Sequence, residues 1–192
     1  MECAQAVLEY AEKHEFQIWT AVGTCLHGAG LANQGRAEEG LTQIQRGMIM
    51  YQELKSPPIF WPLLRSLQAG VCGLAGRTEE GLAILDEILG FPAEGYGSVL
   101  SVEFYRLKGD LLALSPEKSD EAEHWYLSAL KIAGESGASM LELRAAKSLA
   151  RLWWDTDKHE QGRQLLSKAY AKITEGYGTP DMVEARELLG IN

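Results

Sequence analysis

Apolar residues recur along the chain at intervals of three and four positions, the spacing that places side chains on one face of an α-helix. The first segment shows the pattern, since Ala4, Val7, Leu8 and Ala11 follow this spacing within residues 2–13. No segment shows the strict alternation of apolar and polar residues that is typical of a half-buried strand. The pattern therefore predicts an all-α protein.

One short sequence recurs and sets the period of the predicted helices. Residues 35–41 read GRAEEGL, and residues 76–82 read GRTEEGL, 41 positions later. Fainter copies, which place a small residue at Ala122 and at Gly162, continue the period. A fixed period of about 40 residues between helices is typical of arrays of antiparallel helix hairpins, in which each hairpin buries its apolar face against its neighbours.

Each predicted hairpin carries two small residues, one on either side of its turn. Small side chains allow the backbones of two antiparallel helices to approach closely, where a larger side chain would hold them apart. The pairs are Gly28 with Gly40, Ala69 with Gly81, Gly109 with Ala122, and Ala150 with Gly162. We interpret these residues as packing positions and expect close helix contacts there.

We predict a right-handed superhelical array of antiparallel hairpins that forms a single domain over residues 1–192. Its parts are a half repeat, four hairpins and a capping helix, at 1–14, 16–54, 59–91, 98–136, 139–175 and 179–190. A half repeat leaves an apolar face uncovered. We therefore expect either that the chain is a fragment of a larger protein or that another subunit covers this face, and we predict self-association through Val7 and Leu8. The alternative is a native start with a capping helix.

The predicted capping helix has a clear start signal. It begins at Thr179-Pro180-Asp181, where threonine can cap the helix and proline suits its first position. Aspartate in the first turn suits the positive end of the helix dipole.

Composition and charge restrict the cellular setting and the partners. The chain of 192 residues has a formal net charge of −9, which argues against nonspecific binding to nucleic acid or to anionic membranes. The three cysteines, Cys3, Cys25 and Cys72, form no CxxC motif, and their odd number suits a reducing compartment. The sequence has neither a signal-peptide pattern nor an apolar run of about 18 residues. We therefore expect a cytoplasmic protein.

The turn sequences and the paired small residues resemble tetratricopeptide repeats with helices longer than those of the usual repeat of about 34 residues. The likeness is more specific from Phe104 onward. Four segments, at 104–112, 122–130, 141–153 and 174–185, read FYRLKGDLL, AEHWYLSAL, LELRAAKSLARLW and TEGYGTPDMVEA. This series resembles the C-terminal repeat region of large bacterial signalling proteins, in which the repeats follow a nucleotide-binding module joined to a class III nucleotide cyclase or a DNA-binding regulator domain. The resemblance implies a regulatory or interaction array and no catalytic role.

The residues themselves offer no motif for catalysis, for a metal or for a cofactor. The histidines His14, His27, His124 and His159 have no partner at HxxxH or HExxH spacing. Neither a GxxxxGK(S/T) loop nor a GxSxG elbow occurs. We therefore predict that the chain is not an enzyme and holds no cofactor or metal.

The candidate binding residues lie on the first helices of the third and fourth hairpins. Arg144, Lys147 and Arg151 fall at i, i+3 and i+7, which makes one helical stripe beside Trp154. Such a stripe on an acidic protein could receive a carboxylate or phosphate through the bidentate fork of arginine. This arrangement resembles the carboxylate clamp of some peptide-binding tetratricopeptide domains. Arg106, on the preceding hairpin, is the fifth candidate.

In an alternative interpretation, these cations bind no partner molecule. Glu103 and Asp110 bracket Arg106 at helical spacing, and the stripe on the fourth hairpin can be a solvated face.

Two hypotheses of function follow from this pattern. The first is an interaction module that binds a protein or peptide segment, or upstream domains of the same polypeptide, in the concave groove. The second is a sensor domain in which the groove binds a metabolite and controls an upstream nucleotide-binding or effector domain. In the sensor, apolar groove positions such as Val22 and Cys25 would act together with the basic stripe.

Overall fold

The structure is a computed structural model that describes residues 2–55, 59–90 and 97–191. All regular secondary structure in these ranges is helical, with ten α-helices, the 3₁₀ helix Pro116–Lys118 and no strand. The all-α prediction is therefore confirmed for the described part of the chain. Contacts between residues divide the chain into two compact units, Met1–Phe91 and Pro92–Asn192, which we call the first unit and the second unit.

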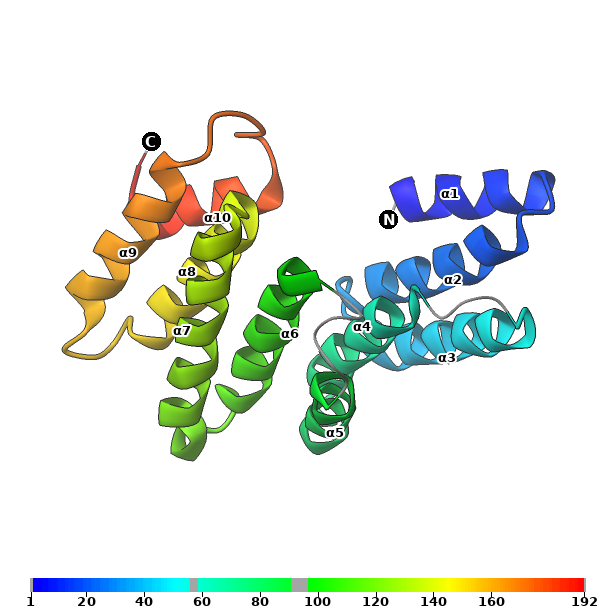
Figure 1. Cartoon of the computed structure of the whole chain (residues 1–192), viewed down its shortest axis with the longest axis horizontal. Helices are drawn as coiled ribbons and strands as arrows, with labels where there is room; N and C mark the ends of the chain where they lie inside the picture. Colours follow the sequence, from blue (N-terminus) through cyan, green and yellow to red (C-terminus); the bar gives the residue numbers. More distant parts are fainter. Residues whose placement is uncertain (1, 56–58, 91–96, 192) are drawn as a thin grey trace. The chain divides into compact units, whose positions relative to one another are not determined.

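Five α-helices make up the first unit, and each packs against the next along the chain (Figure 1). Their bounds are α1 Glu2–Lys13, α2 Gln17–Ala32, α3 Ala37–Glu53, α4 Trp61–Leu74 and α5 Thr78–Leu89. The pairs α2–α3 and α4–α5 are the hairpins that carry the repeated sequence. Val7 and Leu8 of α1 both lie beside Gly23 of α2. Leu8 is half-buried, and Val7 is 38% exposed.

The recurrent GRxEEGL sequence builds the same turn in both hairpins. Gly35 and Gly76 have φ angles of 83° and 73°, in the left-handed region that favours glycine. The amide of Arg36 donates a hydrogen bond of 3.1 Å to the carbonyl of Leu31, and the second turn repeats this bond. This is the Schellman arrangement that ends a helix. Arg36 also pairs with Glu39 at 2.6 Å, which accounts for the arginine and the acidic residue of the repeat.

The paired small residues mark close approaches between helices. A β-carbon on Gly28 would lie 2.6 Å from the carbonyl oxygen of Gly40, and one on Gly162 would lie 3.1 Å from the α-carbon of Ala150. The expected close contacts are confirmed for these two pairs. Gly109 differs, because a β-carbon there would lie 2.5 Å from the ring of Tyr126. In the third hairpin the glycine makes room for an aromatic side chain.

The second unit contains two further hairpins and a last helix (Figure 1). The bounds are α6 Gly97–Leu112, α7 Ser119–Ser136, α8 Ser139–Leu152, α9 His159–Ala171 and α10 Pro180–Leu189. Helix α10 packs against α8 and α9, and its residues Met182, Ala185 and Leu189 join Leu143 and Leu166 in one buried cluster. The last helix is therefore part of the hydrophobic core of this unit.

The start of α10 follows the predicted signal in part. Pro180 occupies the beginning of the helix, as expected. The hydroxyl of Thr179 makes no capping hydrogen bond and is buried without a hydrogen-bond partner among the described residues. Thr179 therefore occupies the predicted N-cap position with an extended backbone, but its side chain does not cap the helix.

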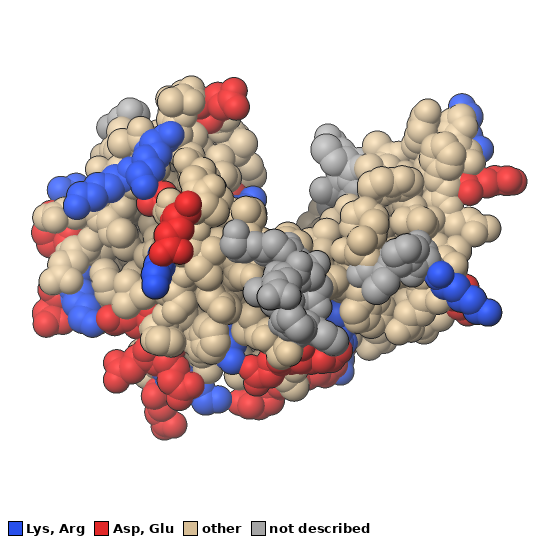
Figure 2. All heavy atoms as spheres, viewed as in Figure 1, with Lys and Arg blue, Asp and Glu red and all other residues tan. Residues whose placement is uncertain are grey.

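Charges are distributed without a single dominant patch on the visible face of the second unit. Figure 2 shows acidic and basic side chains interspersed over this face. This distribution agrees with the many ion pairs of the second unit. None of the described helices has the length and apolar character needed to cross a membrane.

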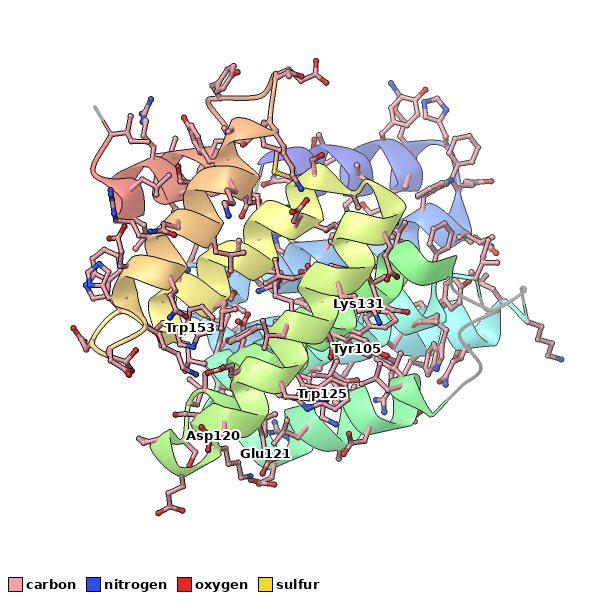
Figure 3. All side chains as sticks on the ribbon, turned by 60° about the vertical axis from the view of Figure 1, so that its left-hand side comes forward. Tyr105, Asp120, Glu121, Trp125, Lys131 and Trp153 are labelled. Atoms are coloured by element: carbon pink, nitrogen blue, oxygen red, sulfur yellow. The ribbon has the colours of Figure 1, made fainter. Side chains whose placement is uncertain are left out.

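Tryptophans in the second unit serve packing between helices. The ring of Trp125 on α7 lies 5.1 Å from that of Tyr105 on α6, centroid to centroid (Figure 3). The Nζ of Lys108 lies 4.2 Å from the centroid of the Trp125 ring. Trp153, labelled at the end of α8 in the same figure, is buried and donates its Nε1–H to Glu123 at 2.8 Å. These contacts hold α7 between its neighbours α6 and α8.

Candidate binding site

A cavity of about 700 Å³ lies within the second unit, between α6, α7, α8 and α10. It brings four of the five candidate residues together. The lining residues are Glu103, Arg106, Asp110, Ala113, Tyr126, Arg144, Lys147, Ser148, Arg151, Leu152, Asp181 and Glu184. Trp154, the fifth candidate, is not among them. Its ring lies against His159 at 4.5 Å between centroids, so the structure does not join it to the cavity.

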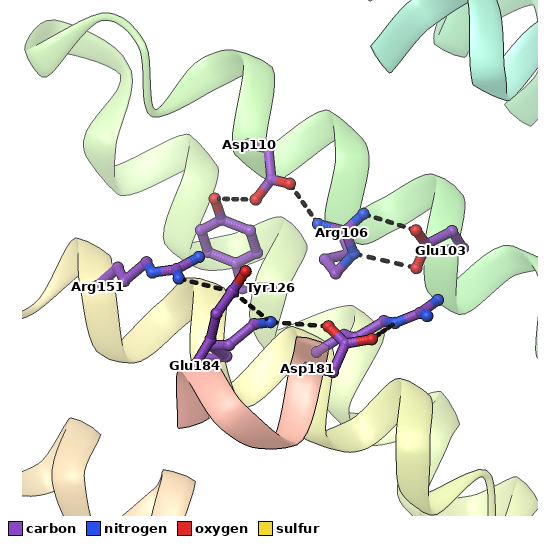
Figure 4. A network of polar contacts seen from close by, with 9 residues as sticks. Glu103, Arg106, Asp110, Tyr126, Arg151, Asp181 and Glu184 are labelled. Carbon is purple, nitrogen blue, oxygen red and sulfur yellow. Dashed lines mark hydrogen bonds and ion pairs between the residues drawn. The ribbon is translucent and has the colours of Figure 1, made fainter. Parts of the chain in front are cut away.

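Lys147 occupies the centre of the basic stripe and is nearly inaccessible, with 7% of its side chain exposed. Its Nζ lies 2.7 Å from Asp181 Oδ1 and 2.7 Å from Glu184 Oε2 (Figure 4). Both carboxylates project from α10, three residues apart. Burial of a charged amine is costly unless the charge is paired. The two carboxylates therefore explain why a lysine is tolerated at this buried position.

The two arginines of the stripe lie on either side of Lys147 and bind the same carboxylates. Arg144 Nε donates to Asp181 Oδ2 at 2.7 Å, and Arg151 Nη2 donates to Glu184 Oε2 at 2.9 Å. The result is a continuous row in which cations and anions alternate across α8 and α10 (Figure 4). The stripe is thus neither a bare cationic surface nor a simple solvated face, because its three cations pair with two carboxylates of α10.

The pKa values of the two α10 carboxyls are lowered. Burial of Asp181 works against ionisation, but the hydrogen bonds from Lys147 and Arg144 outweigh it and lower the pKa of this carboxyl. The hydrogen bond from Lys147 is the main cause of the lowered pKa of Glu184, with burial opposing it and the hydrogen bond from Arg151 adding to it. Both groups are therefore ionised at neutral pH.

A second polar network lines the α6 side of the cavity. Arg106 donates from Nε and Nη2 to both oxygens of Glu103, at 3.0 and 2.6 Å, and from Nη1 to Asp110. The hydroxyl of Tyr126 donates to the other oxygen of Asp110 at 2.8 Å. Arg106 is therefore bracketed by the two acids that flank it at helical spacing, as the alternative interpretation predicts.

The environment fixes the protonation states of this second network. Burial alone would lower the pKa of Arg106, but the hydrogen bond to Glu103 and the charge of Asp110 outweigh burial and raise it. The pKa of Tyr126 is raised by burial, and then by the charge of Asp110. At neutral pH the guanidinium stays charged and the phenol keeps its proton, so both act as hydrogen-bond donors.

The lining of the cavity is balanced in charge. The cations Arg106, Arg144, Lys147 and Arg151 face four anions, Glu103, Asp110, Asp181 and Glu184. In the hydrogen bonds between described residues, Arg144 uses only its Nε and Arg151 only its Nη2. Both side chains are at least 39% exposed. The remaining guanidinium donors of these two residues are the part of the site with capacity for an anionic group.

Sequence reasoning missed the α10 residues of this site. The sequence alone predicts a helix-dipole role for Asp181 and no role for Glu184. A signal was present, since Asp181 and Glu184 are spaced i, i+3, as are Arg144 and Lys147 on α8. Two helices that carry opposite charges at the same spacing can pair them across a contact.

The cysteines and possible metal ligands of the described ranges do not form a second candidate site. Burial raises the pKa of Cys25 to about 12, and burial followed by nearby charges raises that of Cys72 to about 11, so both thiols stay protonated. The side chain of Cys3 lies outside the described residues. Within the described ranges, no group of three or more His, Cys, Asp and Glu residues is arranged to hold a metal ion.

Comparison with known proteins gives one distant relative and no family. No family model matches the chain. An uncharacterized protein of Rhizobium meliloti (strain 1021) is 24% identical over 151 residues. The match covers 79% of this chain but 15% of that protein. The chain is therefore similar to a short region of a much longer bacterial protein.

Proposed function

We propose that the chain is a non-catalytic interaction module that binds an acidic segment of a protein partner in the cavity of the second unit. The observation that carries the proposal is the pair of exposed guanidinium groups, Arg144 and Arg151, on either side of the buried Lys147. Asp181 and Glu184 hold these arginines in place while leaving most of their donors unused. A positioned arginine fork binds a carboxylate more strongly than a mobile one, because less side-chain entropy is lost on binding.

The spacing of the two arginines defines the partner. Arg144 and Arg151 lie seven residues apart on α8, about 10 Å along the helix axis at 1.5 Å per residue. A peptide in the polyproline II conformation rises by about 3.1 Å per residue and has three residues per turn. Acidic residues three positions apart in such a segment therefore share one face and can reach both guanidinium groups. The segment belongs either to another protein or to an upstream domain of the same polypeptide.

We also propose the setting of this module. The hairpins form a right-handed, tetratricopeptide-like superhelix that serves as the regulatory array of a cytoplasmic bacterial signalling protein. The recurrent Schellman turns of the first unit and the close Ala150–Gly162 contact of the second support a shared repeat. The greater length of the Rhizobium meliloti relative supports a place within a larger protein.

The proposal is tested by locating the binding surface of a defined acidic peptide. The probe is an extended peptide with two glutamates separated by two alanines, added to the ¹⁵N-labelled chain of 21.2 kDa. We expect the amide resonances of α8 and α10 to shift on titration, and those of α2 and α3 to stay in place. Shifts confined to the first unit, or no shifts at millimolar peptide, would refute this site.

The second candidate function, a small-ligand sensor, is favoured by one observation. A volume of about 700 Å³ falls within the range of about 300–1,000 Å³ that small-molecule sites occupy. Val22 and Cys25, which the sensor hypothesis includes, are buried in the first unit and are not open to a ligand. A saturable rise in melting temperature with a small dicarboxylate such as succinate, without binding of the acidic peptide, would favour the sensor.

A further inference from the structure

The first unit contains a separate concave surface where the turn between α1 and α2 meets the end of α3. Two adjoining cavities, of about 460 and 650 Å³, share the residues Glu15, Gln17 and Leu54. All the residues that line them belong to the first unit. This surface is distinct from the charged cavity of the second unit and does not depend on its proposed function.

Two half-exposed aromatic side chains form one wall of this surface. Phe16 and Trp19 line the smaller cavity, and 50% of each residue is exposed. Neighbouring rings hold both in place, since Trp19 lies 5.5 Å from Phe60 and Phe16 lies 5.8 Å from His14, centroid to centroid. Large aromatic residues at an exposed, positioned site are the residues that most often carry binding energy in interfaces.

The rim of the same surface is acidic. Glu12, Glu15 and Glu53 line the two cavities, and no lysine or arginine lines either one. All three glutamates are exposed, and none forms an ion pair with another described residue. The acidic rim therefore differs from the charged cavity of the second unit, where each carboxylate of the lining already binds a partner. It has the capacity to bind added cations.

Glu15 has an unfavourable backbone conformation. Its amide donates to the carbonyl of Glu12, and the amide of Phe16 donates to the carbonyl of Ala11. Glu15 therefore has the same position at the end of α1 that Gly35 and Gly76 have at the ends of α2 and α4. Its φ of 56° lies in the left-handed region, which is unfavourable for a residue with a side chain. Strained residues of this kind cluster at functional sites. Lys55, whose φ is also positive, lines neither cavity.

We propose that this surface, defined by Phe16, Trp19, Glu12, Glu15 and Glu53, is a docking site for a basic amphipathic segment of a partner protein. Apolar side chains of the segment pack on Phe16 and Trp19. Its lysine or arginine side chains bind the three carboxylates, and a cation that lies over an aromatic ring is stabilised further. Charge complementarity with the acidic rim selects this partner over an acidic or neutral one.

Three matched peptides test the chemistry of the partner. Each is a short fluorescein-labelled peptide in which leucines alternate in pairs with lysines, with glutamines or with glutamates, and binding to the full chain is followed by fluorescence anisotropy. We expect the lysine peptide to bind at least tenfold more tightly than the glutamine peptide, with an affinity that falls as salt is raised. The glutamate peptide is expected not to bind this surface. Equal binding of the lysine and glutamine peptides would overturn the proposal.

Matched variants separate this surface from the general attraction of an acidic protein for a cationic peptide. The variant Glu12→Gln, Glu15→Gln, Glu53→Gln removes the acidic rim. The control Glu117→Gln, Glu135→Gln, Glu175→Gln removes three exposed glutamates of the second unit, which changes the net charge equally. We expect the first variant to weaken binding of the lysine peptide about tenfold and the control less than twofold. Equal losses in the two variants would refute a localised site.

Two single substitutions test whether weaker peptide binding results from unfolding or from self-association. Glu15→Gly removes both a carboxylate and the backbone strain, so we expect weaker peptide binding together with a higher melting temperature. Trp19→Ala should weaken binding, whereas Trp154→Ala, at an exposed site of the second unit, should not. If the chain instead forms a dimer that Trp19→Ala dissociates, and no basic peptide binds, a second copy covers this surface and the proposal is wrong.

Discussion

The ammonium of Lys147 lies 2.7 Å from the carboxylate of Asp181, which comes 34 positions later in the chain. This contact joins the basic stripe of α8 to the last helix, because Asp181 and Glu184 both come from α10. The stripe is therefore not a free cationic surface, because its three cations pair with these two carboxylates. The cavity beside it then depends on the arginines at its two ends for its remaining binding capacity.

The first prediction concerns the buried charge. Replacing Lys147 by methionine leaves Asp181 and Glu184 next to each other with one arginine each. We expect the free energy of unfolding to fall by about 2–3 kcal/mol, measured by urea denaturation. Arg151→Gln is the control, and we expect it to cost less than about 1 kcal/mol because Arg151 is half exposed. An equal cost for both, or a gain for Lys147→Met, would show that apolar contacts alone hold α10.

The second prediction concerns acid stability. The pKa values of Asp181 and Glu184 are lower in the folded protein than their ordinary values. The unfolded chain therefore binds more protons at acid pH, and the stabilisation from these groups, present above a pH of about 4–5, is lost as the pH falls further. The variant Asp181→Asn, Glu184→Gln should be less stable at pH 7 but lose less stability on acidification. Parallel curves of unfolding free energy against pH for both proteins would contradict this expectation.

The third prediction tests the close crossing of α2 and α3. Alanine at position 28 places a β-carbon 2.6 Å from the carbonyl oxygen of Gly40, so the helices must move apart. We expect Gly28→Ala to lower the free energy of unfolding by about 2–3 kcal/mol. Gly134→Ala on α7 is the matched control, because its β-carbon meets nothing within 4 Å. This control should gain up to about 1 kcal/mol from the better helix propensity of alanine.

A feature of this structure could be predicted from the sequence when the residues that cause it lie close together along the chain. The hairpin turns could be predicted because their causes lie within a few residues, as with the left-handed φ of Gly35 and the pairing of Arg36 with Glu39. The bracketing of Arg106 by Glu103 and Asp110 was also local.

The pairing of the basic stripe could not be predicted in the same way. Lys147 meets Glu184 across 37 positions, and the direction from which α10 approaches α8 is set by the burial of Met182 and Leu189. Similarly, nothing local indicates that Gly109 would face the ring of Tyr126 on the next helix. Side-chain contacts between distant helices depend on packing geometry that periodicity alone does not contain.

The fourth prediction concerns the first helix. Self-association through Val7 and Leu8 stays a prediction. Both residues lie beside Gly23, but they differ in burial, since Leu8 is half-buried while 38% of Val7 is exposed. We expect concentration-dependent dimers in analytical ultracentrifugation, which Val7→Glu dissociates without unfolding the chain. Leu8→Glu should instead lower the melting temperature, because it places a charge at a half-buried position. A strict monomer at high concentration would contradict self-association.

The most direct test of the proposed interaction module is the affinity of the acidic peptide for the charged cavity. A fluorescein-labelled Glu-Ala-Ala-Glu peptide is titrated into the wild-type chain, into Arg144→Gln, Arg151→Gln, and into a control, Arg36→Gln, Arg163→Gln, that removes two exposed arginines elsewhere. Lys147 is retained so that α10 stays in place. We predict that the first variant binds at least tenfold more weakly, a loss of about 1.4 kcal/mol, and that the control binds as the wild type does. Equal affinity of all three proteins, with α10 still folded, would contradict the account.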